Sequence, residues 1–129
     1  MTWDNLLARK NFARMFEKPQ ASLVSIGANT MMAVWVMPVS WEPLRFALSI
    51  GKARFTHEKL RIGGEIKLGA PRGESYEKAV REFGRRSGWD YDKPRPEDFA
   101  IHGVMYTFRI ESLLDVGDHT LVICGDLMI

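Results

Sequence analysis

Short apolar runs separated by glycine and proline dominate the first half of the chain. The runs Ser22–Ile26, Met31–Met37 and Leu44–Ile50 each have the length of a strand, and Glu65–Leu68 is a shorter run of the same kind. Runs of this length between turn residues are typical of β-strands. The pattern therefore predicts a succession of strands in this half of the chain.

Alternation of apolar and polar residues is the signal in the last third of the chain. His102–Ile110 alternates strictly, which predicts a strand with one covered face; the residues on that face are Val104, Tyr106, Phe108 and Ile110. Gly117–Asp118 then predicts a turn, and His119–Met128 has the pattern of a last strand.

Helical spacing occurs in three segments. Trp3–Lys18 predicts a short helix, and Thr56–Ile62 predicts one or two helical turns with Thr56 as the N-cap. Glu74–Ser87 is the clearest helix, because apolar residues recur there at helical spacing, at Tyr76, Val80 and Phe83.

These elements favour a small antiparallel split β-barrel with helices packed outside it. Strands and long helices do not alternate regularly, so a doubly wound parallel sheet is not expected. Several strands are apolar on both faces, which suits a barrel that is covered from outside by a helix or a second subunit. The 129 residues suit one domain. We therefore expect a single, mainly β domain with flanking helices over residues 1–129.

Composition and charge exclude several classes of function. The 18 basic and 16 acidic residues give a net charge of +2, which disfavours a nucleic-acid binder. No run is long and apolar enough for a membrane helix, and residues 1–10 lack the apolar block of a secretory signal, so we expect a cytoplasmic protein that binds no membrane. Cys124 is the only cysteine and is predicted to be an inert core residue. The three histidines have no metal-site spacing, so no metal is predicted.

Arg54 and Thr56 are the first candidates for binding a ligand. A helix N-terminus presents unpaired N–H groups, and it is a natural phosphate site. The Thr56 hydroxyl and the Arg54 guanidinium would add to such a site, and Thr56 would then be accessible in the absence of ligand. From these residues alone, a capping threonine beside a surface arginine is the commoner interpretation.

Other segments offer weaker candidates. Lys93 lies in the loop Ser87–Lys93 and could reach a phosphate as a point charge, although a solvated loop is the simpler interpretation. His119 follows a tight turn, and its side chain titrates near neutral pH. A cluster of thioether and aromatic side chains suits a barrel core and subunit interface, or a seat for a flat ring; its members are Met31, Met32, Trp35, Met37 and Trp41.

Four stretches of the sequence are informative because of the order in which they occur. They are Asn29–Ser40, Ser49–His57, Ser87–Lys93 and Gly117–His119. In this order, and at roughly this spacing, they resemble the flavin reductase-like family, also described as flavoredoxin-like FMN-binding split barrels. The resemblance extends from about Leu23 to the end of the chain.

The resemblance implies a homodimer that binds FMN, or FAD, without a covalent bond. It also implies that NADH or NADPH reduces the flavin, or that electrons pass on to a redox partner protein. Because the cofactor supplies the redox chemistry, a conventional catalytic acid is not required, and the sequence identifies no catalytic residue. The residues that the resemblance assigns to the flavin pocket are Asn29, Ala33, Val34, Trp35, Ser40, Arg54, Thr56, Lys93 and His119.

Within that set, the resemblance places Asn29 and Trp35 beside the isoalloxazine ring and Ser40 near the same pocket. Arg54 and Thr56 would serve the phosphate end, and so would Lys93. His119 would contact the flavin, from the same subunit or from its partner.

Two departures from the family leave a second function open. Members commonly continue past the last matched strand with a C-terminal extension, whereas this sequence ends at Ile129. Pro94 also follows Lys93 where an aromatic residue is usual. The alternative is a non-enzymatic dimeric module of the same shape, which binds flavin or another ligand such as haem without reductase activity.

Overall fold

The structure is a computed structural model, and it describes residues 10, 22–27, 29–71, 73, 76–84 and 94–128. The helix predicted over Trp3–Lys18 lies outside the described residues, apart from Lys10. The loop Ser87–Lys93, with its candidate Lys93, lies outside them as well.

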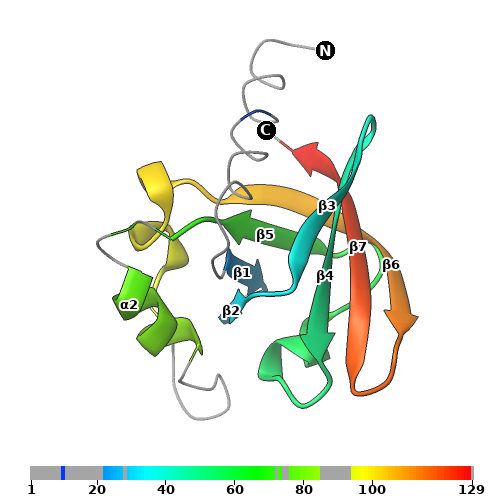
Figure 1. The fold of residues 1–129 in the computed structure, drawn as a ribbon, viewed down its shortest axis with the longest axis horizontal. Coiled ribbons are helices and arrows are strands. Elements are labelled where there is room, and N and C mark those ends of the chain that lie inside the picture. The colour runs from blue at the N-terminus through cyan, green and yellow to red at the C-terminus, as the bar shows by residue number, and fades with distance from the viewer. Residues whose placement is uncertain are drawn as a thin grey trace.

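One curled antiparallel sheet forms the body of the molecule (Figure 1). Its strands are β1 (Ser22–Ile26), β2 (Asn29–Ala33), β3 (Val36–Trp41), β4 (Leu44–Gly51), β5 (Glu65–Gly69), β6 (Tyr106–Asp115) and β7 (His119–Met128). They lie in the order β2-β1-β5-β6-β7-β4-β3, and each neighbouring pair is antiparallel. The predicted mainly β split barrel is therefore confirmed.

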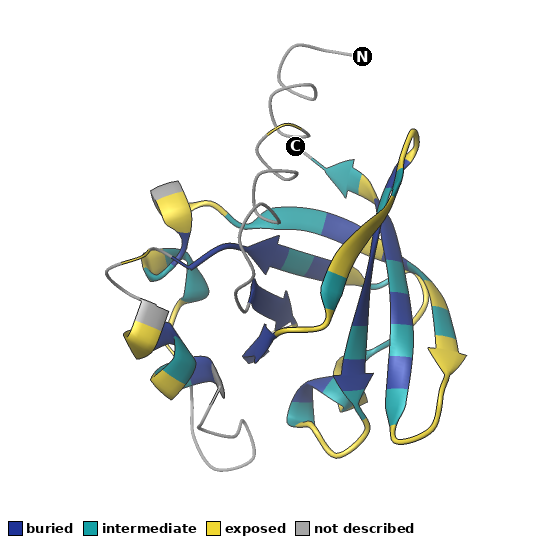
Figure 2. Cartoon of the chain, in the orientation of Figure 1, coloured by how far each residue is buried: buried dark blue, intermediate teal, exposed yellow. Residues whose placement is uncertain are grey.

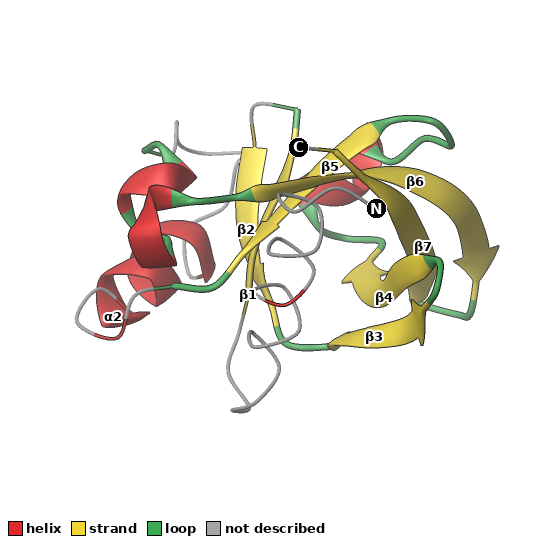
Figure 3. Cartoon of the chain, turned by 90° about the horizontal axis from the view of Figure 1, so that it is seen from above, coloured by secondary structure: helices red, strands yellow, loops and turns green. Residues whose placement is uncertain are grey.

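Short helical segments gather beside one end of this sheet, next to β1 and β2 (Figure 3). They are α2 (Tyr76–Ala79), the π-helical turn η3 (Val80–Gly84) and the 3-10 turns η4 (Pro96–Asp98) and η5 (Ile101–Gly103). A further 3-10 turn, η1 (Phe55–Lys59), follows β4. Of the helix predicted over Glu74–Ser87, only the part over residues 76–84 is described, and there the α-helical turn α2 widens into the π turn η3.

The buried apolar residues form two clusters, and Figure 2 colours each described residue of the chain by its burial. The larger fills the inside of the curled sheet, where the rings of Phe46 and Phe108 meet edge to face at 4.7 Å. The smaller lies between the sheet and the helical segments, and its buried members are Leu23, Met32, Ala79, Phe83 and Ala100. This second cluster covers the outer face of β1 and β2.

The prediction of one strand over Met31–Met37 is wrong. β2 ends at Ala33 and β3 begins at Val36, because β2 pairs with β1 whereas β3 pairs with β4. The chain crosses between the two edges of the sheet at this break, where the backbone N–H of Val36 donates to the carbonyl of Val34. The two strands could not be separated from the sequence because the apolar run continues across the break.

Two other boundaries differ from the predictions. Thr56 is not an N-cap: Arg54 has that position, and no side chain caps the turn. The Thr56 side chain is instead 1% exposed, because it turns into the protein. The strand predicted from His102 begins at Tyr106, since Ile101–Gly103 forms a 3-10 turn that ends on Gly103 at φ 66°.

Candidate functional site

A hollow of about 320 Å³ opens where the link between β2 and β3 passes the ends of β4 and β7. Its lining residues are Met31, Met32, Ala33, Val34, Trp35, Ser49, Gly51, Arg54 and His119. The fold thus brings together residues from three distant segments of the chain. Five of the nine residues assigned to the flavin pocket from the sequence line this hollow, namely Ala33, Val34, Trp35, Arg54 and His119.

The link between β2 and β3 forms an exposed apolar wall of the hollow. Val34 is 70% exposed and Trp35 is 64% exposed, although both are large apolar residues. The Trp35 ring lies 4.9 Å from the ring of His119, and the two planes are tilted by 44°. An aromatic ligand gains most from such a surface, because ring contacts combine burial of apolar area with favourable geometry.

Gly51 forms part of the opposite wall of the hollow, and it adds no side chain there. It pairs with His119 across β4 and β7. A Cβ atom at Gly51 would lie 3.6 Å from Cγ of Arg54 and 3.6 Å from Nε2 of His119, which is ordinary contact. Alanine would therefore fit, whereas any larger side chain would extend among the side chains of Arg54 and His119.

Arg54 provides the positive charge of the hollow. It is exposed and lies just before η1. Within the described part of the chain, its guanidinium makes no ion pair or hydrogen bond, so its donors are available to an anion. Arginine binds carboxylate and phosphate groups through two parallel hydrogen bonds, which makes it a suitable anchor for a phosphate.

Asn29 and Thr56 have a structural role in this arrangement. Both side chains are buried, and Nδ2 of Asn29 donates a hydrogen bond to Oγ1 of Thr56. The bond ties β2, which lines the hollow, to η1, which directly follows the lining residue Arg54. The expectation that Thr56 would be accessible without ligand is therefore wrong, because its hydroxyl already has a buried partner.

Ser40 lies elsewhere, near the end of β3 and just before the turn into β4. Its Oγ donates to the carbonyl of Pro43 at 2.6 Å, and Ser40 does not line the hollow. Its assignment to the flavin pocket rests on the family resemblance alone, as does that of Lys93.

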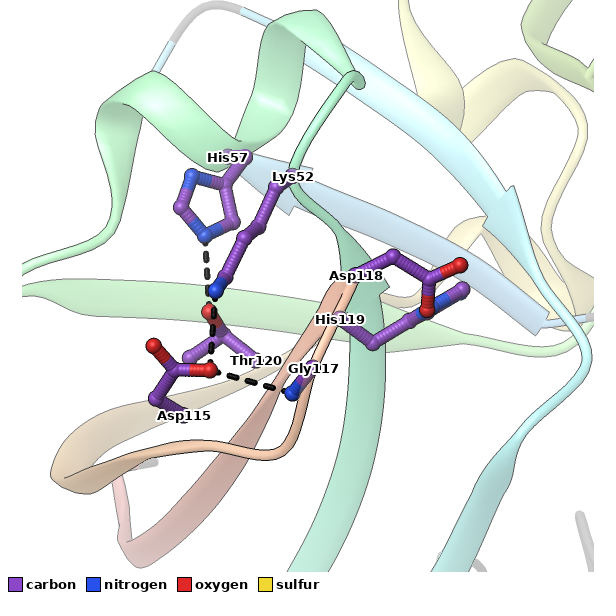
Figure 4. Close-up of polar contacts among 7 residues, drawn as sticks. All are labelled: Lys52, His57, Asp115, Gly117, Asp118, His119 and Thr120. Atoms are coloured by element: carbon purple, nitrogen blue, oxygen red, sulfur yellow. Dashed lines mark hydrogen bonds and ion pairs between the residues drawn. The ribbon is translucent and has the colours of Figure 1, made fainter.

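The turn between β6 and β7 is anchored by a network that sequence reasoning missed (Figure 4). Nζ of Lys52 lies 2.8 Å from Oδ1 of Asp115, which also accepts a hydrogen bond of 3.0 Å from the backbone N–H of Gly117. The hydrogen bond from Lys52 and then that from Gly117 lower the pKa of Asp115. Nearby, His57 Nε2 lies 2.8 Å from Oγ1 of Thr120. No local motif signals these pairs, since they join residues about sixty positions apart.

A larger polar groove of about 820 Å³ lies on another part of the surface. It is lined by residues of β1, β5, β6, the end of η1 and the segment that follows η1, among them Lys59, Arg61, Lys67 and Arg109. None of the residues assigned to the flavin pocket is among its lining residues. Size alone therefore favours this groove, but the chemistry expected from the sequence gathers at the smaller hollow.

In the described residues, no helix has the length and apolar character needed to cross a bilayer. Over the same residues, no three side chains of His, Cys, Asp or Glu come together as a metal site.

A curled antiparallel sheet with a hollow beside β2, β4 and β7 defines a split-barrel domain. Residues 19–125 match the family model described as the flavin reductase like domain. The chain therefore belongs to this family, and the resemblance seen in the sequence is confirmed. A comparison with curated proteins finds no match.

Solved structures share the fold at low sequence identity. An FMN-binding protein from Thermus thermophilus with bound p-hydroxybenzaldehyde is 23% identical, with a TM-score of 0.69 over 81% of this chain and 67% of that one. Flavoredoxin from Methanosarcina acetivorans is 17% identical, with a TM-score of 0.68 over 81% and 64%. The flavin reductase of styrene monooxygenase from Pseudomonas putida S12 is 24% identical, with a TM-score of 0.66 over 91% and 82%. This chain spans about two thirds of the first two, and identities this low establish the fold alone.

Proposed function

We propose that this chain binds FMN in the hollow and acts as an NAD(P)H-dependent flavin reductase or a flavin-mediated electron carrier. One observation carries the proposal. Stretches that resemble the family at three separate places in the sequence supply the walls of one hollow. FAD would be accepted at the same site if its adenylate remained outside the hollow.

The residues of the hollow fit a flavin. Its volume lies in the range of ligand sites, roughly 300–1,000 Å³. Val34 and Trp35 offer a flat apolar surface for the isoalloxazine ring, and His119 offers a polar group at its border. Arg54 offers the cation that the phosphate requires.

A bound flavin would supply the hydride and electron chemistry, so the protein needs only to bind, orient and shield it. The rings of Trp35 and His119 contact each other, and this contact would hold both side chains in place so that they orient the isoalloxazine ring. Arg54 would fix the phosphate end. The Asn29–Thr56 hydrogen bond would keep β2 and η1 at a constant separation.

A homodimer is part of the proposal. β3 is an edge strand of the sheet, and its side chains Met37, Val39 and Trp41 are exposed. Exposed apolar edge strands favour association, and a second copy of the chain would cover this one. Since β3 directly follows Val34 and Trp35, such an interface would border the hollow.

Titration with FMN, followed by visible absorbance and by tryptophan fluorescence, tests the flavin site. Arg54→Ala should weaken binding of FMN about tenfold, because a charge-assisted hydrogen bond to phosphate contributes about 1.5 kcal/mol or more. Riboflavin has no phosphate, so its binding should not change. Arg61→Ala removes an arginine of the polar groove instead, and it should leave both affinities as they are.

The outcomes separate the possible functions. Flavin binding together with oxidation of NADH or NADPH identifies a reductase. Binding without that oxidation excludes a reductase and leaves an electron carrier or the non-enzymatic module that binds flavin. If neither FMN nor FAD binds, the proposal fails and the non-enzymatic module is favoured. Equal loss of FMN in both arginine variants would show that the phosphate is not bound at Arg54.

A further inference from the structure

His119 is held by the residue that precedes it in the chain. Its Nδ1 lies 2.8 Å from Oδ1 of Asp118. An ionised carboxylate can only accept hydrogen bonds, so Nδ1 of His119 carries the hydrogen. In the neutral imidazole, Nε2 then has a free lone pair and acts as an acceptor.

The free nitrogen of His119 lies beside Gly51, and both residues line the hollow. The position of a Cβ atom at Gly51, on the wall of the hollow, is 3.6 Å from Nε2. Among the described residues, Nε2 makes no hydrogen bond. The structure thus places an unused acceptor at the border of the site where the flavin is proposed to bind.

Backbone hydrogen bonds hold the turn that carries His119. The backbone N–H of Lys52 donates to the carbonyl of Asp118 at 2.9 Å, and the N–H of Val116 donates to the carbonyl of His119 at 3.1 Å. The Lys52–Asp115 ion pair joins the same two turns (Figure 4). These bonds fix the backbone, so the Asp118 carboxylate is left to orient the imidazole.

We propose that Asp118 is a positioning residue, which fixes the Nδ1–H tautomer of His119 so that Nε2 accepts a hydrogen bond from an N–H group of the bound ring. The acceptor role rests on the proposed function. Two ligands offer this chemistry, namely the imide of the isoalloxazine ring and the carboxamide of a nicotinamide. An aspartate is ionised at neutral pH, and the hydrogen bond from His119, followed by the charge of that imidazole when it is protonated, lowers the pKa of Asp118 further.

The tautomer can be measured without any ligand, by NMR of ¹⁵N-labelled imidazoles at a pH where His119 is neutral. The His119 signals are assigned by their loss in His119→Gln. Asp118→Asn is nearly isosteric, but the amide can turn to accept or to donate. Because the Asp118 side chain is 98% exposed, solvent weakens this pair, and the ratio of the Nδ1–H to the Nε2–H form should fall roughly two- to fivefold.

Asp126→Asn is the matched control, because Asp126 is an exposed carboxylate at the other end of β7 whose φ of 57° asparagine tolerates. It should leave the tautomer ratio unchanged. If wild-type His119 carries its hydrogen on Nε2, or if the ratio is the same in wild type and Asp118→Asn, the positioning role is wrong.

The acceptor role is tested by adding FMN and, in a separate sample, nicotinamide mononucleotide. A hydrogen bond to Nε2 moves its ¹⁵N signal upfield, and the ligand that causes the shift identifies the donor. The shift should be lost or reduced in Asp118→Asn. If FMN binds but neither ligand moves the signal, the acceptor role is overturned. If FMN does not bind at all, the proposed function fails, whereas the ligand-free tautomer ratio still decides the role of Asp118.

Discussion

The strands β2 and β3 are neighbours in the chain and lie at opposite edges of the sheet, yet their environments differ sharply. All five residues of β2 are buried, whereas most of β3 is exposed. Both strands carry methionine and other apolar side chains. Hydrophobicity alone therefore does not decide which edge of this sheet is covered.

The difference lies in what the chain provides as a cover. The side chains of Met32 and Leu23 pack against Phe83 and Ala79, so the helical segment protects the edge at β2. In the described residues, Met37 and Val39 of β3 belong to neither buried cluster, and both side chains are exposed. A buried edge indicates a structural role, and an exposed apolar edge beside a hollow indicates a surface for a partner or ligand.

Two methionines of these strands give the largest expected contrast. Met32→Ala should lower the free energy of unfolding by about 2–5 kcal/mol, because it leaves a cavity beside Leu23 and Phe83. Met37→Ala should change it by no more than about 0.5 kcal/mol, since that side chain is mostly exposed.

Urea unfolding of both variants at several protein concentrations measures these changes in the free energy of unfolding. Concentration matters because association also stabilises the folded state. A large loss in Met37→Ala at the lowest concentration would show that β3 is covered within the single chain.

A charge on β3 should disrupt the proposed dimer without unfolding the chain. We expect Met37→Glu to raise the dimer dissociation constant at least tenfold, or about 1.4 kcal/mol, because a carboxylate would be buried without a partner. Analytical ultracentrifugation measures this constant. Ile62→Glu is the control, since Ile62 is equally exposed but lies in the loop after η1, and its variant should associate like wild type. Equal effects of the two variants would count against β3 as the interface.

Much of this fold could be predicted from the sequence because its signals are local. The bounds of β1 and β7 agree with the predictions, since Gly27 and Gly117 provide turns with φ of 61° and 124° at their ends. The break between β2 and β3 could not be predicted, because it depends on which strands they pair with. The prediction of Thr56 as an N-cap was wrong for the same reason, because the Thr56 hydroxyl accepts a hydrogen bond from the distant residue Asn29.

The site was predictable only as far as family motifs reach. Trp35, Arg54 and His119 were identified through stretches that resemble a known family, and the fold brings them to one hollow. Lys52 and Asp115 were missed, because an ion pair between ordinary surface residues leaves no pattern in the sequence. Gly51 lay within a matched stretch but was not singled out. The importance of its missing side chain becomes apparent only when the structure places His119 and Arg54 beside it.

Cys124 shows whether changes at the exposed edge reach the interior of the sheet. It is buried in β7, and burial, together with the nearby charge of Glu111, raises the pKa of its thiol from 9.0 to about 12. Above pH 9 the unfolded chain releases this proton while the folded chain retains it, so stability falls as pH rises. Between pH 9 and 10, the wild type should therefore lose about 1 kcal/mol more than Cys124→Ala. In urea unfolding, Met37→Glu should lose as much stability between pH 9 and 10 as the wild type, because exposing β3 leaves Cys124 buried in β7. A smaller loss would mean that the interior around Cys124 has opened.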